Sequence, residues 1–499
     1  MCEEAGGLLR RTAMSVNIRE RWDFSCALFD GQARLIAQAA HIPVHLGSAA
    51  DSVRAVIDAL ELGPGDVAVL NDPYAGGTHL PDVTLVRPVF VGTHRRRPSF
   101  FLVDRAHHAD IGGAVPGSMG VATDLMAEGL VIPPVKLRSA GRVCEDVLRL
   151  FSANVRGAAE RIADLQAQEA SLLLAEKRLL SLVKEYGLAA VERYAAHLMD
   201  YSERLARSVV SDLPKGTFEA SDIMEDDGTG QGPFHIRLAL TVSRRGLTFD
   251  FTGTDAQARG GINANPSVVL AACVYVLRCL CPSRLPTNEG VFRLVRILTG
   301  KGSLVDPLSP APVAGGNVET SQRLVDVVLK ALARALPGRI PAASAGTMSN
   351  LSVGGDGFSF YETLPGGAGA GPWGDGPSAV QTHMTNTRNT PIEETELRHP
   401  VQVTSLTIRR RSGGGGSHRG GDGLVKELRL LVPATVSLFS DRQRRGPPGM
   451  QGGSPGQAGR ARMAVDRGWR ALPSKGSFAA VRGSCLRIET PGGGGWGAP

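Results

Sequence analysis

Two short motifs each place a histidine three residues before an aspartate. One is His79-Leu80-Pro81-Asp82, at the entry to an apolar stretch, and the other is His107-His108-Ala109-Asp110, after a second apolar stretch. Imidazole and carboxylate together suit a divalent ion such as Mn²⁺, Fe²⁺, Co²⁺ or Zn²⁺, which polarises a carbonyl group or activates water. One such motif alone is common. Two of them, each beside glycines, indicate a metal site on loops at neighbouring strand ends.

A third histidine cluster comes earlier, in the run His41-Ile42-Pro43-Val44-His45. Two interpretations of it are equally good. The cluster lines the same cleft as the two motifs, or it packs internally and caps a helix that begins near Ser48. The sequence alone does not separate them.

Two further stretches are rich in side chains that form hydrogen bonds. The run from Gln381 to Thr390 is polar without being charged like a solvent-exposed loop, so it is either a substrate-orienting loop or a polar turn satisfied by its own backbone. The run from Gly315 to Ser321 precedes a predicted helix, where free backbone N–H groups bind an anion or are simply capped. Neither a Gly-x-x-x-x-Gly-Lys-Ser/Thr phosphate loop nor a Gly-x-Ser-x-Gly elbow supports a role here. If ATP is used, another chain is expected to bind it.

Composition narrows the class of protein. The chain has 499 residues, 42% hydrophobic and 21% charged, which is typical of a globular protein with two to four domains. No apolar run approaches the roughly 18 residues of a membrane span, and the first residues lack a secretory signal, so we expect a cytoplasmic protein. The seven scattered cysteines contain no CxxC pair, which disfavours a disulfide framework and a zinc ribbon.

The formal net charge of +7 comes largely from short arginine clusters at 95–97, 409–411 and 442–445. A nucleic-acid surface needs such clusters to converge, with aromatic residues for stacking on single strands, and aromatic residues make up only 5% of the chain. We therefore expect solvated loops, or anchors for anionic substrates and partner surfaces, and no nucleic-acid partner.

The pattern of apolar residues predicts a mixed α/β, multi-domain protein with four regions. Residues 1–140 form an α/β region with short buried strands at 66–70, 83–90 and 99–103, and it carries the metal site. Residues 141–213 form a helical segment broken near Gly187. Residues 214–340 form a second α/β region, with strands in 217–251 and helices at 268–280 and 322–336. Residues 341–499 form a strand-rich and glycine-rich region whose glycine runs are ordered turns rather than linkers.

Eight blocks of residues, in order along nearly the whole chain, resemble the hydantoinase B/oxoprolinase family. The sequence departs from the family's usual pattern at its start, where the family has a further helical stretch. The blocks are Ser15 to Leu46, Asn71 to Asp82, His107 to Gly113, Glu128-Gly129 with Pro133 to Lys136, Gly315 to Ser321, His383 to Thr390, Arg419 to Gly423, and Glu489 to Gly497.

The resemblance implies a metal site made of His79, Asp82 and His107. His108, Asp110 and His383 are the further catalytic candidates it suggests, although capping a loop or supporting a ligand suits the first two as well. The candidate substrate-binding residues lie in the two polar runs: Asn317, Thr385, Asn386 and Arg388.

The family also implies an activity and a partner. Members resemble subunits that open hydantoin or 5-oxoproline rings, while a separate hydantoinase A-type subunit phosphorylates the substrate with ATP. The first interpretation is therefore a subunit of a hetero-oligomeric, ATP-dependent cyclic amidohydrolase with a divalent metal ion of the Mn, Zn, Fe or Co class. The second is a subunit of an ATP-dependent ketone carboxylase acting on acetone or acetophenone. A third is a metal-stabilised scaffold for an ATPase.

Overall fold

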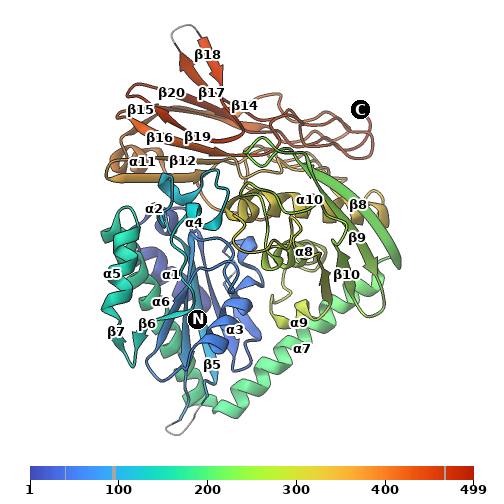
Figure 1. Cartoon of the computed structure of the whole chain (residues 1–499). Helices are drawn as coiled ribbons and strands as arrows, with labels where there is room; N and C mark the ends of the chain where they lie inside the picture. The colour runs from blue at the N-terminus through green and yellow to red at the C-terminus, as the bar shows by residue number, and fades with distance from the viewer. Residues whose placement is uncertain (40, 93–96, 466–467) are drawn as a thin grey trace.

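The computed structural model describes residues 1–39, 41–92, 97–465 and 468–499 (Figure 1). Within these ranges the chain forms four β-sheets, with long helices packed against the first two, so the mixed α/β class expected from the sequence is confirmed. Arg95 and Arg96 of the first basic cluster lie outside the described residues. No helix in the described ranges has the length and apolar character needed to cross a membrane.

The first sheet holds seven strands, all antiparallel, in the order β2-β1-β5-β4-β3-β6-β7. The three apolar stretches recognised in the sequence form its centre. The last of them is longer than expected, because its strand pairs on both sides as far as His107 and so keeps several polar residues within the sheet. The strands are β1 Phe24–Asp30, β2 Leu35–Gln38, β3 Val67–Leu70, β4 Asp82–Val89, β5 Phe100–His107, β6 Val135–Ser139 and β7 Arg142–Val143.

Helices cover both faces of this sheet. On one face the apolar sides of α1 (Cys2–Thr12) and α6 (Ala158–Tyr186) share a core with β3, β4 and β5. On the other face α3 (Ser48–Ala59) packs Val53 and Val56 against alternate residues of the same strands. The two-residue alternation of a strand therefore decides which helix each side chain meets. Short helices α2 Val16–Arg19, α4 Leu125–Glu128 and α5 Glu145–Asn154 complete this region.

A buried carboxyl group on β5 gives the sheet a predicted pH dependence. Burial raises the pKa of Asp104 to about 7, although Ser171, Gln168 and Cys26 donate hydrogen bonds to it. The usual pKa is about 4, so the folded chain holds a proton that the unfolded chain has lost between about pH 4 and 7. This contribution to stability is complete below about pH 4 and is lost as the pH rises through 7. We expect Asp104→Asn to flatten the fall in melting temperature between pH 5 and 8, measured by calorimetry. Equal slopes for both proteins would show that Asp104 ionises normally.

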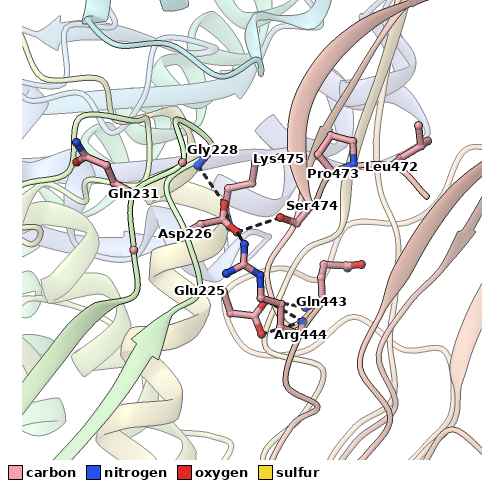
Figure 2. A pocket seen from close by; sticks show the side chains of 12 residues that line it. Glu225, Asp226, Gly228, Gln231, Gln443, Arg444, Leu472, Pro473, Ser474 and Lys475 are labelled. Carbon is pink, nitrogen blue, oxygen red and sulfur yellow. Dashed lines mark hydrogen bonds and ion pairs between the residues drawn. The ribbon is translucent and has the colours of Figure 1, made fainter. Parts of the chain in front are cut away.

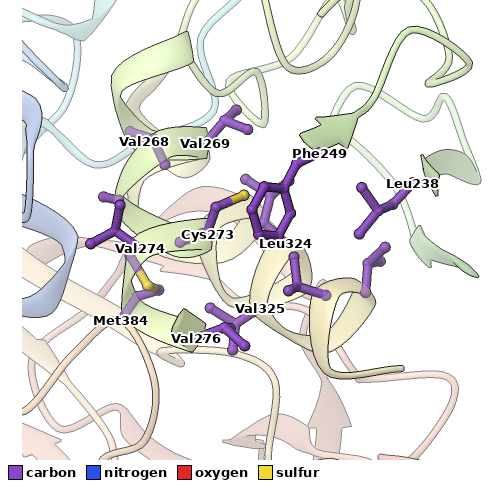
Figure 3. Close-up of a cluster of buried hydrophobic side chains, with 14 of the residues drawn as sticks. Leu238, Phe249, Val268, Val269, Cys273, Val274, Val276, Leu324, Val325 and Met384 are labelled. Atoms are coloured by element: carbon purple, nitrogen blue, oxygen red, sulfur yellow. The ribbon is translucent and has the colours of Figure 1, made fainter. Parts of the chain in front are cut away.

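The second sheet, β11-β10-β9-β8, packs against helices α8 and α10, and α7 lies along it (Figure 1). Figure 3 shows the apolar core between them, where Phe249 and Leu238 of the sheet face Cys273 of α8 and Leu324 of α10. The expected strands and helices of 214–340 are thus present. Their bounds are α7 Leu188–Asp212, β8 Gly216–Met224, β9 Phe234–Val242, β10 Leu247–Asp250, α8 Pro266–Leu280, α9 Glu289–Phe292, β11 Val295–Leu298 and α10 Ser321–Ala335, the last preceded by a π-helical turn, Gly316–Thr320.

The third and fourth sheets face each other as a sandwich around one apolar core. The third has the order β13-β12-β16-β19 and the fourth β14-β15-β20-β17-β18. Their elements are β12 Asn350–Gly355, β13 Phe358–Thr363, α11 Ile392–Arg398, β14 Val401–Arg409, β15 Gly423–Leu430, β16 Ala434–Phe439, β17 Arg460–Val465, β18 Gly468–Ala471, β19 Lys475–Ala480 and β20 Cys485–Glu489.

The glycine runs beside this sandwich are ordered, as expected. Their backbones bond to one another, for example from Gly493 N to Gly421 O and from Gly414 N to Gly493 O. A Cβ atom on Gly493 would lie 1.9 Å from the carbonyl oxygen of Ala368, so no larger residue fits there. Glycine is used here because extended chains approach each other closely.

The division into four regions stays a prediction. The helical segment is present as α5, α6 and α7, broken at Gly187 as expected. Leu165, Leu172 and Leu179 of α6 belong to the core of the first sheet, whereas Ala206 and Val210 of α7 belong to the core of the second. The helical segment therefore ties two cores together.

Candidate metal centre and its surroundings

Strand pairing brings the three proposed metal ligands together. Asp82 is the first residue of β4 and His107 the last of β5, and the two are direct partners in the antiparallel register. Such partners have Cβ atoms only about 5 Å apart. His79 comes from the loop just before β4. Asp82 Oδ1 lies 3.1 Å from Nε2 of His79 and 3.3 Å from Nδ1 of His107. One ligand atom from each residue lies within 4.8 Å of the other two, and all three side chains are buried.

The loop that carries His79 is fixed by buried amides. The Asn71 side chain donates to the carbonyl oxygen of Leu80, and Asn265 from the start of α8 donates to those of Gly77 and Thr78. A Cβ atom on Gly77 would lie 2.3 Å from Asn71 O, so the tight loop needs glycine there. The histidine is therefore held by the backbone of two regions of the chain.

The two oxygens of Asp82 have different surroundings. Oδ2 accepts a hydrogen bond from the Thr78 hydroxyl at 2.7 Å and lies 3.2 Å from Nε2 of His45. The other nitrogen of His45 is 3.0 Å from the Ser25 hydroxyl. Oδ1 is left for the two histidines. Of the two interpretations of the His41–His45 cluster, His45 thus joins the cleft, while His41 packs on Phe24.

The protonation states favour cation binding. Burial alone would raise the pKa of Asp82, but the imidazoles of His79 and His45 hold it well below its usual value, so the group is a carboxylate. Burial lowers the pKa of His107, which keeps a ring nitrogen free to act as a ligand.

Unpartnered polar atoms test whether these residues fit a metal ion. Asp82 Oδ1, both ring nitrogens of His79 and Nε2 of His107 are buried without a hydrogen-bond partner in the described part of the chain. Burying such atoms unpaired costs free energy, which coordination of a cation would recover. One carboxylate and two imidazoles fit a divalent ion of the Mn, Fe, Co or Zn class.

An aromatic residue from the third sheet closes the centre. The ring of Tyr361 stacks on His107, with centroids 4.9 Å apart and planes 16° apart. Its hydroxyl donates to Asn350, and the guanidinium of Arg21 lies 4.9 Å from the centroid of its ring. Sequence reasoning assigned no role to Tyr361, and a lone tyrosine in an apolar strand gives no signal of one. Thr78 and Arg21 lay within recognised motifs but were also unassigned.

Two of the predicted catalytic residues point away from the three ligands. His108 lies one residue beyond His107 and faces α6, where its Nε2 is 3.0 Å from the Gln168 side chain. Asp110 accepts hydrogen bonds from the backbone of Gly112 and Gly117 and from Arg156. The structure thus gives Asp110 a loop-fixing position and does not bring it to the centre.

His383 lies against α10 rather than at the centre. Its Nε2 is 3.9 Å from Asp326 and has no hydrogen-bond partner among the described residues, and burial lowers its pKa to about 4. Asn317, in the π-helical turn before α10, is also buried, with an unpartnered side-chain oxygen. Within the described chain, neither residue forms a hydrogen bond or an ion pair with the three ligands.

The rest of the polar run alternates between inside and outside. Thr385 is buried and lies near Thr387, which in turn contacts Thr363 beside Arg21. Asn386 and Arg388 are exposed, and the Arg388 guanidinium lies 3.7 Å from the ring centroid of Trp22. The run therefore presents threonines to the interior and its charged member to an outer cavity.

A separate cavity of about 420 Å³ lies between the β8–β9 connection and the C-terminal sheets (Figure 2). Its walls are tied by Asp226, which contacts Ser474 and Arg444, and by Glu225, which accepts from the backbone of Arg444. None of the predicted site residues lines it.

Comparison with known proteins agrees with this geometry. The chain is 38% identical to 5-oxoprolinase 1 of Arabidopsis thaliana, over 100% of the chain and 41% of that protein. It is 30% identical to a putative D-/L-hydantoinase subunit, the B-type one, of a Pseudomonas species, over 99% of the chain and 87% of that protein.

A solved structure matches the whole fold. The ATP-dependent caprolactamase of Pseudomonas jessenii superposes with a TM-score of 0.91 at 28% identity, over 100% of this chain and 89% of that one. The chain spans less than half the length of the plant 5-oxoprolinase but most of the length of the other two proteins. The family model described as hydantoinase B/oxoprolinase matches residues 1–499. The chain therefore belongs to the hydantoinase B/oxoprolinase family.

Proposed function

We propose that this chain is the ring-opening subunit of an ATP-dependent cyclic amidohydrolase acting on hydantoin-like or 5-oxoproline-like rings. Family membership makes it a hydrolase of carbon–nitrogen bonds in cyclic amides. The observation that carries the finer proposal is the buried group of His79, Asp82 and His107, whose unpartnered ligand atoms converge at paired strand ends.

Each residue of the centre has a distinct task in this proposal. A divalent ion bound there would supply Lewis-acid activation of water or of the substrate carbonyl. Asp82 provides the negative charge, and Thr78 and His45 fix its orientation by holding Oδ2. Tyr361 stacks on His107 and sets the plane of that imidazole. Water is excluded because all three ligands are no more than 3% exposed, which strengthens electrostatic interactions in the site.

The polar residues around the centre are proposed to act on the substrate. Asn317, His383 and Thr385 are buried and supply hydrogen-bonding groups, two of which have no partner among the described residues. Ring amides and imides need such donors and acceptors for orientation. Asn386 is exposed, so its contribution would require a substrate that reaches the surface.

The proposal assigns ATP use to a hydantoinase A-type partner subunit, which would phosphorylate the ring oxygen in a hetero-oligomer. The sequence has no phosphate-cradling loop, one relative is named as a hydantoinase subunit, and the matching caprolactamase is ATP-dependent. Phosphorylation turns the oxygen into a leaving group, so the chain described here would complete the hydrolysis.

We expect the purified chain alone to show no substrate-stimulated ATP hydrolysis, because it lacks that loop. Adding an A-type partner should restore it. A coupled assay for ADP, with and without the partner, makes the measurement. Substrate-stimulated release of ADP by the isolated chain would refute this division of labour.

The substrate class is tested with the reconstituted pair and a panel of hydantoins, 5-oxoproline and ketones, each with and without bicarbonate. The proposal predicts turnover of a cyclic amide that does not depend on bicarbonate. Turnover restricted to ketones with bicarbonate would instead make the chain a carboxylase subunit. Absence of turnover together with stoichiometric metal binding would leave a scaffold role.

Removing the hydroxyl that holds Asp82 is expected to weaken metal binding. Thr78→Val keeps the shape of the side chain but deletes the 2.7 Å hydrogen bond to Oδ2, and partners of this kind are worth about tenfold or more in metal affinity. Thr78→Ser, which keeps the hydroxyl, is the matched control and should bind Mn²⁺ or Zn²⁺ nearly as well as the natural chain. Calorimetric titration measures the two affinities. Equal affinity for Val and Ser would show that Thr78 does not orient the ligand.

A further inference from the structure

A cavity of about 530 Å³ lies where the end of α1, the turn around Trp22 and the outer side of the polar run meet. Four arginines line it: Arg10, Arg11, Arg19 and Arg388. They come from segments far apart in the sequence, and the backbone bond from Arg388 N to Arg21 O, 3.0 Å long, joins those segments. The basic character of the cavity is therefore produced by the tertiary fold and is not a single charged run.

The carboxylates near the cavity neutralise only part of this charge. Arg19 pairs with Glu20 at 2.9 Å and with Glu394 at 2.8 Å, and Glu394 is shared with Arg398. Among the described residues no carboxylate lies within ion-pair distance of Arg10, Arg11 or Arg388. Three guanidinium charges thus face one concave space, where the potential favours an anion.

The guanidinium groups are also pre-positioned. Those of Arg10 and Arg388 lie 4.7 Å and 3.7 Å from the centroid of the Trp22 ring. Contact with the ring face holds an arginine in place while its N–H groups remain able to donate. Guanidinium forks match the oxygens of a phosphate group in pairs, which a lone surface charge does not.

We propose that this cavity, framed by Arg10, Arg11, Arg388 and Trp22, binds the phosphate groups of a small molecule. Inorganic pyrophosphate and the diphosphate of a nucleotide share this chemistry. The inference rests on the cavity alone and is independent of the ring-opening activity. It also gives Arg388 a role in a site separate from the buried centre.

Calorimetric titration of the full chain with pyrophosphate, and separately with ADP, tests the proposal. The variant Arg10→Gln/Arg11→Gln should bind pyrophosphate at least about tenfold more weakly, because two paired donors are lost. The matched control is Arg244→Gln/Arg245→Gln, an adjacent exposed arginine pair in the β9–β10 turn with the same change in net charge. It should bind as the natural chain does.

A conservative variant keeps the test independent of folding. Arg388→Lys retains the charge but loses the fork, so a few-fold loss of affinity is expected with an unchanged melting temperature. Tighter binding of ADP than of pyrophosphate identifies a nucleotide as the ligand, and the reverse order identifies free phosphates. Both orders support the site. No saturable binding of either probe, equal loss in the two double variants, or binding of a polyglutamate peptide only would overturn it.

Discussion

Replacing Asp82 by asparagine is expected to abolish ring opening, by more than about a hundredfold, and to lower the bound metal, while the fold stays nearly intact. The amide has the shape of the carboxyl group and still meets Thr78 and His45 through one atom. It lacks the negative charge at the position of Oδ1, between His79 and His107. Turnover with the partner subunit and metal content by mass spectrometry are the measurements.

Asp110→Asn is the matched control for this change. Asp110 is another fully buried aspartate, but its oxygens are used by the backbone of Gly112 and Gly117 and by Arg156. Its variant should lose some stability and keep its metal. Full metal occupancy with normal turnover in Asp82→Asn would show that Asp82 has only a structural role.

The second large effect concerns the adjacent histidines 107 and 108. Successive side chains of a strand point to opposite faces of the sheet. Along β5 the side chain of Arg105 reaches Ser48 and Ser52 of α3, and that of Asp104 reaches Ser171 of α6. His107 follows Arg105 to the face that holds His45, whereas the next residue turns towards α6. We therefore expect His107→Ala to lose most of the bound metal and His108→Ala to lose little.

Stability should change in the opposite sense. His108→Ala leaves a space between Gln168 and Phe151 in the core, and a cavity there should lower the melting temperature by several degrees. Metal content and melting temperature of the two variants separate the roles. Metal loss in His108→Ala with full occupancy in His107→Ala would mean that the ligand assignment is wrong.

The sequence predicts the centre because its chemistry is local. The motif His79 to Asp82 and the histidine that ends β5 are recognisable by type and spacing, and both flank apolar runs that form strands. The direct pairing of Asp82 with His107 depends on the register of two strands. That register follows from the whole antiparallel sheet and is not encoded in either motif.

Residues that act from distant parts of the chain escaped prediction for the same reason. Tyr361 reaches His107 from a different sheet, and nothing in its neighbours along the chain marks it. His45 was left between two interpretations, since only tertiary packing shows that its ring meets Asp82. Asp110 repeats the His-x-x-Asp spacing, but the glycine turn after it consumes its oxygens.

The most direct test of the account is a crystal of the chain grown with Mn²⁺ or Zn²⁺, with diffraction recorded on both sides of the absorption edge of the metal. The account predicts an anomalous peak about 2.0–2.3 Å from Asp82 Oδ1 and from a ring nitrogen of each of His79 and His107. A crystal with strong anomalous signal elsewhere and none between these three side chains would contradict it.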